Sequence, residues 1–196
     1  MSKRYPWFYA VNDRPVQIVE LRGGATDCLV YDHKTGNFVP DRSYFEQVAP
    51  GSGKDVDELD AAAFGTLVAA RRAELVKKLA ERMCSAKSGS EQDLLEALGV
   101  AVTPAPLGGM SARVRSGMAP SFEVDLPAGV LAHGDVSARL GEAKQLPRTG
   151  ARNSITLWYA VEVPGAPHRC SVFTRFETQP QPTTPIESVM FRLDPA

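Results

Sequence analysis

Residues 155–177 read ITLWYAVEVPGAPHRCSVFTRFE, and this stretch decides the fold of the C-terminal half of the chain. Two β-favouring runs, Ile155–Val163 and His168–Glu177, flank the four-residue loop PGAP. A hairpin closed by this loop places Val163 opposite His168 and so sets every other pair. The pairs expected on the core face are Ile155/Phe176, Leu157/Thr174, Tyr159/Val172 and Val161/Cys170. The pairs expected on the opposite face are Thr156/Arg175, Trp158/Phe173, Ala160/Ser171 and Glu162/Arg169.

The opposite face carries two large aromatic side chains among polar ones. Trp158 and Phe173 face each other there, and Arg175 lies on the same face. Aromatic groups on such a face are either covered by other parts of the chain or contact a partner. Cover by the chain's own helices is the simpler interpretation. The partner interpretation makes Trp158, Phe173 and Arg175 the candidate partner-binding residues.

The rest of the chain predicts an α+β fold in three blocks. Residues 1–50 alternate short β-favouring runs with three turns, which indicates a small β-meander with a barrel-like curl. Residues 51–99 are expected to be helical, and residues 100–196 to form an antiparallel, β-rich region. An alternative division joins 51–196 into one domain.

Two helices are expected between residues 55 and 99. Asp55, Asp57 and Glu58 suit the first turn of the first helix, because the helix dipole favours negative charge there. The apolar stripe of this helix consists of Phe64, Val68, Leu75, Leu79 and Met83. Ser90 as N-cap and Gly99 after the last turn delimit a second, shorter helix.

Composition and charge narrow the classes of partner. The 196 residues carry 22 Lys and Arg against 23 Asp and Glu, and the net charge of −1 argues against nucleic-acid binding. We expect no secretory signal and no membrane partner, because no apolar run approaches the roughly 20 residues of a membrane helix. Three widely spaced cysteines are not a disulfide framework, so we expect a reduced, cytoplasmic protein. The 15 Arg against 7 Lys favour a bacterial or phage source.

Two sets of residues bear on metal and phosphate binding. Cys28, His33, His168 and Cys170 have the side chains of a tetrahedral zinc site. Their spacing matches no zinc finger, so we expect no metal and no cofactor. Residues 51–54, GSGK, resemble a phosphate-binding loop, but Asp55 stands where Ser or Thr would hold magnesium. We therefore expect no nucleotide site.

Acid–base or nucleophilic chemistry has one candidate pair, His133 and Asp135. We expect both residues in a glycine-containing loop, where an exposed turn histidine is the simpler interpretation. Cys84 ends a basic helix, and the negative C-terminal end of the helix dipole is expected to raise its pKa. No catalytic residue is therefore assigned.

Four basic residues gather near Pro147 and Gly150, and they are Arg139, Lys144, Arg148 and Arg152. Arginines on a loop suit phosphate or carboxylate contacts, which makes these the candidate anion-binding residues. No aromatic residue interleaves them in the sequence, so a solvated loop is the simpler interpretation.

These patterns favour a non-enzymatic protein that binds another protein, or a second copy of itself. An adaptor, an immunity or inhibitor protein, and a component of a phage or secretion particle all fit this description. The alternative is a small hydrolase-type enzyme that uses His133 and Asp135 or the metal candidates. A small loop-borne active site leaves no motif in a sequence, so the two functions remain open at this point.

Overall fold

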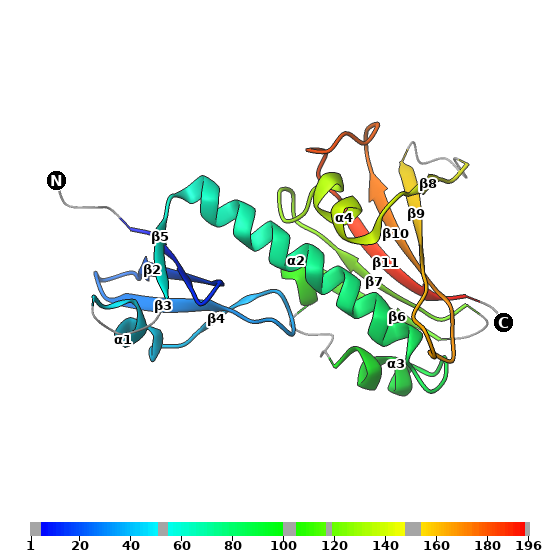
Figure 1. The fold of residues 1–196 in the computed structure, drawn as a ribbon, viewed down its shortest axis with the longest axis horizontal. Coiled ribbons are helices and arrows are strands. Elements are labelled where there is room, and N and C mark those ends of the chain that lie inside the picture. The colour runs from blue at the N-terminus through cyan, green and yellow to red at the C-terminus, as the bar shows by residue number, and fades with distance from the viewer. Residues whose placement is uncertain (1–4, 51–54, 100–104, 117–118, 148–153, 195–196) are drawn as a thin grey trace. The chain divides into compact units, whose positions relative to one another are not determined.

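The computed structural model describes residues 5–50, 55–99, 105–116, 119–147 and 154–194. Within these ranges, four α-helices and two antiparallel sheets form the α+β fold that the sequence predicts. The chain divides into two compact units, residues 1–71 and 72–196, and the boundary falls inside helix α2 (Ala61–Cys84) (Figure 1). No helix in the described ranges is long and apolar enough to cross a membrane.

The first unit contains an open five-stranded sheet in the order β4-β3-β2-β1-β5. Its strands are β1 (Trp7–Val11), β2 (Arg14–Glu20), β3 (Thr26–Tyr31), β4 (Phe38–Pro40) and β5 (Val56–Leu59). The expected meander is confirmed, but the barrel-like curl is wrong, because the edge strands β4 and β5 do not pair with each other. Pro40 disfavours closure, since it ends a three-residue edge strand and has no N–H to donate. Helix α1 (Tyr44–Val48) packs against one face of this sheet.

Residues 55–60 depart from the sequence prediction. Asp57 and Glu58, expected in the first turn of a helix, lie in β5 and pair with β1. Without β5, the backbone groups on that side of β1 would lack partners in the sheet, and pairing satisfies them. The helix begins one residue after Asp60, whose carboxylate accepts a hydrogen bond from the backbone N–H of Ala63 at 2.7 Å.

Helix α2 buries its predicted apolar stripe. In the first unit, the ring of Phe64 stacks on that of Phe8 with 4.5 Å between the ring centres. In the second unit, Leu75, Leu79 and Met83 are fully buried in the hydrophobic core. The 4- and 7-residue spacings in the sequence therefore identified the buried side of this helix.

The second unit contains a six-stranded sheet in the order β6-β7-β11-β10-β9-β8. Its strands are β6 (Ser111–Arg115), β7 (Ser121–Asp125), β8 (Lys144–Gln145), β9 (Ile155–Val161), β10 (Cys170–Phe176) and β11 (Ser188–Leu193). Pairing between β9 and β10 confirms the predicted register, with Trp158 opposite Phe173 and Tyr159 opposite Val172. The predicted pair Glu162/Arg169 lies just beyond the ends of both strands.

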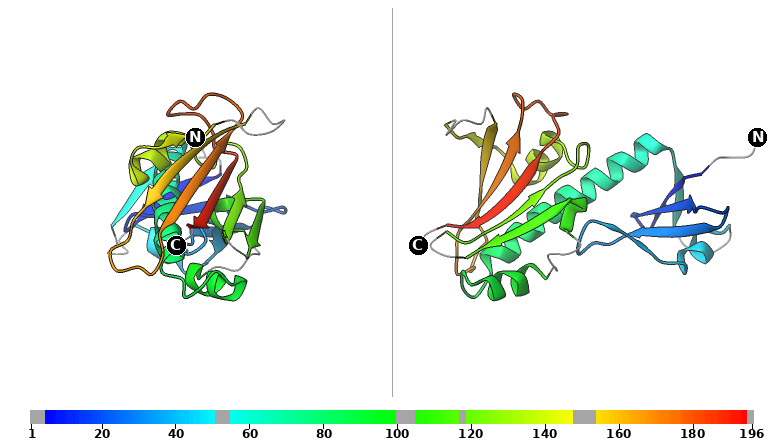
Figure 2. Two further views of the ribbon diagram at one scale, coloured as in Figure 1. Left: turned by 90° about the vertical axis from the view of Figure 1, so that its right-hand side faces the viewer. Right: turned by 180° about the vertical axis from the view of Figure 1, so that it is seen from behind.

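The helices of the second unit lie on one face of this sheet (Figure 2). The second half of α2, α3 (Glu91–Leu98) and α4 (His133–Leu140) build the core together with that face. Ser90 accepts a hydrogen bond from the backbone N–H of Asp93, and Gly99 has a φ of +61°, so α3 has both predicted caps. Strand residues that alternate with the core residues form the opposite face, called the outer face below.

A methyl group at Gly109 has no room beside β7. A Cβ there would lie 2.4 Å from a methyl carbon of Val124 and 2.7 Å from the carbonyl oxygen of Asp125. We expect Gly109→Ala to lower the free energy of unfolding by about 1–3 kcal/mol. Gly65→Ala is the matched control, because a Cβ at this position in α2 meets nothing within 4 Å and alanine favours the helix by up to about 1 kcal/mol. Urea denaturation measures both variants, and equal midpoints would contradict the close approach at Gly109.

Candidate functional site

One row of side chains crosses all six strands on the outer face. Successive strand pairs align Arg113, Glu123, Met190, Phe173, Trp158 and Lys144. None of these six residues belongs to the helix-covered core of the described part of the second unit. The row therefore carries the predicted aromatic pair on the face that lies away from the helices.

Two cations lie on the aromatic pair. The Lys144 ammonium is 5.4 Å from the centre of the Trp158 ring, and the Arg192 guanidinium carbon is 4.6 Å from the centre of the Phe173 ring. Phe173 is 7% exposed, whereas Trp158 is half-buried. The expected cover by the chain's own helices is therefore wrong. The aromatic pair is shielded by cationic side chains of its own face.

Trp158 is also held by a chain of hydrogen bonds. Its indole Nε1–H donates to Ser171 Oγ at 2.6 Å. The Ser171 hydroxyl donates in turn to Asp194 at 2.8 Å, and Asp194 accepts from Arg192 at 3.0 Å. The arginine that covers Phe173 thus closes a network that fixes the orientation of Trp158.

The other end of the row is an ion-pair network around Glu123. The side chain of Glu123 is only 12% exposed, and its carboxylate lies 3.1 Å from Arg175 and 3.3 Å from Arg113. Asp125 adds an ion pair to Arg113 at 3.0 Å and accepts a hydrogen bond from Ser111 at 2.7 Å. Arg175, a candidate partner-binding residue, is therefore held in place on the outer face.

His133 and Asp135 lie at the start of α4, so the expectation of a loop is wrong. The Asp135 carboxylate accepts a hydrogen bond from the backbone N–H of Ala132 at 2.9 Å and caps the helix. His133 Nδ1 has two hydroxyl neighbours, Ser137 Oγ at 3.1 Å and the Tyr159 hydroxyl at 3.3 Å. The His133 imidazole therefore contacts two hydroxyl groups, and the Asp135 carboxylate caps the N-terminus of α4 instead of contacting the imidazole.

The proline-rich segment 178–185 explains why this part of the chain is helical. The backbone N–H groups of His133 and Gly134 donate to the carbonyl oxygens of Thr184 and Pro182 at 2.9 and 2.8 Å. These bonds satisfy two N–H groups that the first turn of a helix leaves unpaired. Because both acceptors come from a distant segment, the residues around His133 carry no sign of them.

The environment of His133 sets its chemistry. Burial lowers the pKa of His133, and burial raises the pKa of Tyr159. A neutral imidazole beside Ser137 resembles a base beside a hydroxyl. Ser137 and Tyr159 contact the same nitrogen, Nδ1, whereas the nucleophile and the carboxylate of a catalytic triad contact different ring nitrogens. Sequence reasoning missed Ser137, because it lies four residues after His133 and reaches it only if the segment is a helix.

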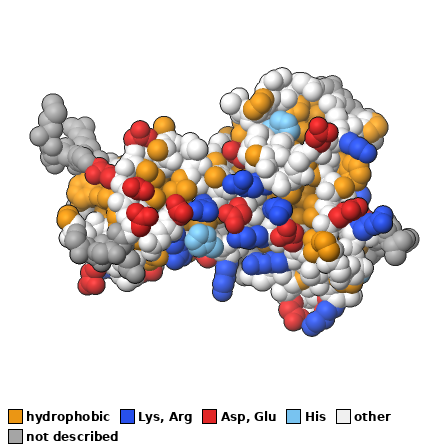
Figure 3. Space-filling model, viewed as in Figure 1, with side chains coloured by type: hydrophobic (Ala, Val, Ile, Leu, Met, Phe, Trp, Pro, Cys, Tyr) orange, Lys and Arg blue, Asp and Glu red, His pale blue; other side chains and the backbone are white. Residues whose placement is uncertain are grey.

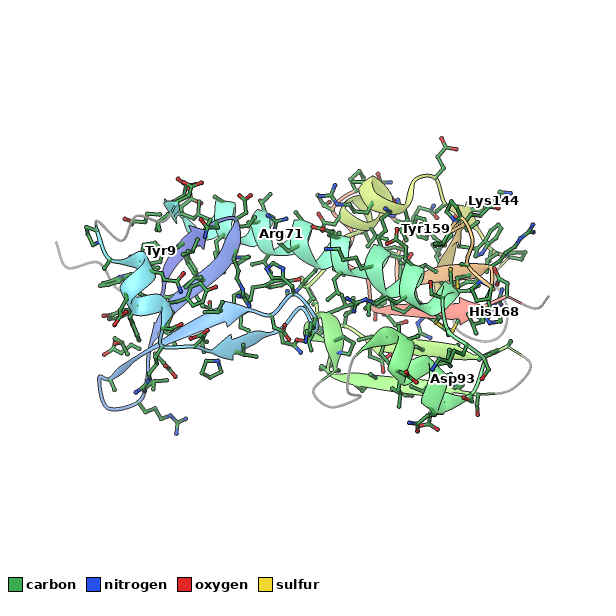
Figure 4. All side chains as sticks on the ribbon, turned by 60° about the horizontal axis from the view of Figure 1, so that its bottom comes forward. Tyr9, Arg71, Asp93, Lys144, Tyr159 and His168 are labelled. Carbon is green, nitrogen blue, oxygen red and sulfur yellow. The ribbon has the colours of Figure 1, made fainter. Side chains whose placement is uncertain are left out.

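The four metal candidates are divided between the two units. Cys28 is buried in the core of the first unit, and His33 follows β3, where it meets the ring of Tyr31 edge-on at 5.3 Å. Cys170 is buried in the core of the second unit, and His168 lies in the loop between β9 and β10 (Figure 4). Among the residues with described positions, no group of three or more His, Cys, Asp or Glu is placed to hold a metal ion.

The four anion-binding candidates are also separate. Arg139 is exposed on α4, and Lys144 lies over Trp158 on the outer face. Arg148 and Arg152 lie outside the described residues. On the side drawn in Figure 3, basic side chains are interspersed with acidic ones. The structure therefore assigns Lys144 to an aromatic contact.

The titration of His133 is measurable through stability. Because burial lowers its pKa below the ordinary 6.5, the unfolded chain binds more protons than the folded chain between the two pKa values. We expect the free energy of unfolding to fall as the pH drops below about 6.5, and to fall less in His133→Gln, which has no proton to gain. Urea denaturation between about pH 7 and pH 5 measures both slopes. Arg139→Gln, exposed on the same helix, should keep the wild-type slope, and equal slopes in all three proteins would contradict a buried, neutral His133.

Comparison with protein-family models, with curated protein sequences and with solved structures found no match to this chain. The outer face and the histidine cluster are therefore interpreted from their own geometry.

Proposed function

We propose that this chain acts by binding another protein through its outer face, with Trp158 as the central contact. The observation that carries the proposal is the half-buried Trp158 ring, fixed by Ser171 on the sheet face that lies away from the helices. Tryptophan and arginine are enriched among the few residues that dominate the energy of protein interfaces. Trp158 and Phe173 form the proposed centre of the contact, and Arg175 lies at its polar rim.

The charged side chains around this centre are ordered before any partner binds. Arg175 is held by Glu123 at 3.1 Å, and Arg192 is held by Asp194 at 3.0 Å. A side chain that is already fixed loses less conformational entropy in a complex than a mobile one. The outer face therefore offers arginines to a partner at a low entropic cost, which supports the proposal.

We propose that the chain acts in the reducing cytoplasm, because all three of its cysteines are free thiols. The partner is another protein or a second copy of this chain. Acidic and basic groups are mixed on the outer face, which fits a protein partner better than a nucleic acid. An adaptor, an immunity or inhibitor protein and a component of a phage or secretion particle are the roles that this chemistry suits.

A small hydrolase is the alternative, and one observation favours it. His133 Nδ1 lies 3.1 Å from Ser137 Oγ, within reach for proton transfer. Under this alternative, Ser137→Ala abolishes turnover of a chromogenic ester such as p-nitrophenyl acetate, whereas Trp158→Ala leaves it unchanged. Under the binding proposal, the wild-type chain and both variants show only the background rate.

Neighbouring residues of β9 separate binding from folding, because they point to opposite faces. Leu157 is 6% exposed in the core, whereas Trp158 lies on the outer face. We expect Trp158→Ala to weaken partner binding by about 2 kcal/mol or more with little change in melting temperature. Leu157→Ala should lower the free energy of unfolding by about 2–5 kcal/mol. Thermal melts of both variants check the second half of this prediction without knowledge of the partner.

Photocrosslinking in cells checks the first half. A benzoylphenylalanine at Ala160, which is exposed and opposes Ser171 on the outer face, should form a discrete protein adduct. Trp158→Ala should remove this adduct. The same group at Ala138, exposed on α4, is the control and should form none. An adduct that survives Trp158→Ala would count against Trp158 as the anchor, and equal adducts at both positions would count against the outer face.

A further inference from the structure

Two cysteines from distant parts of the sequence meet in the core of the second unit. Cys84 is the last residue of α2, and Cys170 is the first residue of β10. The backbone N–H of His168 donates to the carbonyl oxygen of Cys84 at 3.3 Å, which holds the end of the helix beside the start of β10. Both cysteines belong to the same hydrophobic core cluster of the second unit.

A second contact places the Cys84 sulfur at the same point. Cys84 Sγ lies 3.9 Å from the carbonyl oxygen of Val161, and Val161 is the residue directly opposite Cys170 in the β9–β10 ladder. Facing residues of an antiparallel pair have neighbouring side chains, so Cys84 lies over the position that Cys170 occupies. Cys84 and Cys170 are 0% and 2% exposed, which shields both thiols from large reagents.

The third cysteine has no share in this contact. Cys28 is buried in the core of the first unit, among apolar side chains of the five-stranded sheet. Burial raises the pKa of its thiol to about 11. Cys28 therefore serves as a control in oxidation experiments, because it is a buried thiol with no neighbouring cysteine in its core cluster.

The two paired thiols are not equivalent. The hydrogen bond from Cys170 lowers the pKa of Cys84, whereas the hydrogen bond to Cys84, together with burial, raises the pKa of Cys170. The pKa of Cys84 is therefore lowered, contrary to the expectation from its place at a helix C-terminus, and the adjacent Cys170 thiol is the largest cause. Cys84 is the better nucleophile of the two, since the thiolate is the reactive form.

We propose that Cys84 and Cys170 are a redox site, in which a small peroxide converts the two thiols into a disulfide between α2 and β10. Cys84 loses its proton, and the resulting thiolate attacks one oxygen of hydrogen peroxide, so that an S–O bond forms and the O–O bond breaks. The hydroxide that leaves takes up the proton that Cys84 released and becomes the first water. The Cys170 sulfur then attacks the Cys84 sulfur, the S–S bond forms, the S–O bond breaks and a second water leaves with the Cys170 proton. Two thiols are oxidised and one peroxide is reduced to two waters. A thiol reductant reverses the bond by exchange.

The disulfide would join the end of the buried helix to an inner strand of the sheet. Such a link restricts the unfolded chain, and a long loop between the linked residues increases its effect. The oxidised chain should therefore unfold at a higher temperature than the reduced chain, by roughly 5 °C or more. Reduction with dithiothreitol should return the melting temperature to its starting value.

Trypsin separates the three cysteines, so the wild-type chain itself gives the test. Cys84 falls on peptide 83–87, Cys170 on peptide 170–175 and Cys28 on peptide 23–34. The folded chain is treated with hydrogen peroxide, and the peroxide is removed. The remaining free thiols are then alkylated after unfolding in urea, and the digest is analysed by mass spectrometry without reduction. We expect peptide 83–87 joined to peptide 170–175 with the loss of two hydrogens, and peptide 23–34 in its alkylated form.

Single variants identify the order of the steps. Cys170→Ser should accumulate sulfenic acid on Cys84, which dimedone traps when the treated chain is unfolded in its presence. Cys84→Ser should leave Cys170 unoxidised at the same peroxide dose. Cys28→Ser should form the disulfide as the wild type does. The proposal is overturned if the folded wild-type chain yields no link between peptides 83–87 and 170–175. It is also overturned if links to peptide 23–34 form as often as that link in the folded chain. Oxidation in urea is the control, because the unfolded chain should form all of these links.

Discussion

The register of β9 against β10 is the constraint on which the second unit depends. Side chains alternate between the two faces of a sheet, so a slip of one residue would exchange the buried set for the exposed set. The observed register places Tyr159 and Val172 among the helices and Trp158 and Phe173 on the other face. The same alternation points Cys170 into the core, where α2 ends, and Tyr159 towards His133 of α4. A single pairing therefore positions the outer-face aromatic pair, the histidine cluster and the thiol pair together.

The outer face shows how a sheet can carry aromatic rings without a helix over them. Lys144 and Arg192 lie on the rings, and such contacts contribute about 0.5–1 kcal/mol each at exposed sites. Full burial of an aromatic ring contributes more, about 1.5–3 kcal/mol. Because Trp158 is already half-buried, a partner that displaces Lys144 gains the remaining part of this burial, which is comparable with the contact that it displaces. The cations shield the rings in the free chain without preventing their use.

Elements with strong local patterns were predictable from the sequence. The stripe of α2, the caps Ser90 and Gly99 of α3 and the β9–β10 register each depend on residues that lie near one another in the chain. Strand β5 and helix α4 were not predictable, because distant partners decide them. The acidic segment of β5 is a strand because β1 offers it an edge. Gly134 looked like a loop residue, yet a Cβ there would lie 2.9 Å from the carbonyl oxygen of Pro182, so a close approach to another segment accounts for the glycine.

The candidate sites follow the same physical rule. The aromatic pair was found because a hairpin relates Trp158 to Phe173 through one short loop, so that counting along the strands is enough. The thiol pair could not be found in this way. Its contact depends on where α2 ends above the sheet, and that is set by the packing of the whole core. From sequence, Cys84 was a thiol at a helix end, and the dipole was the only influence on its pKa that could be assigned. The neighbouring Cys170 thiol, which the sequence does not place beside Cys84, is the largest influence on the pKa of Cys84 and lowers it.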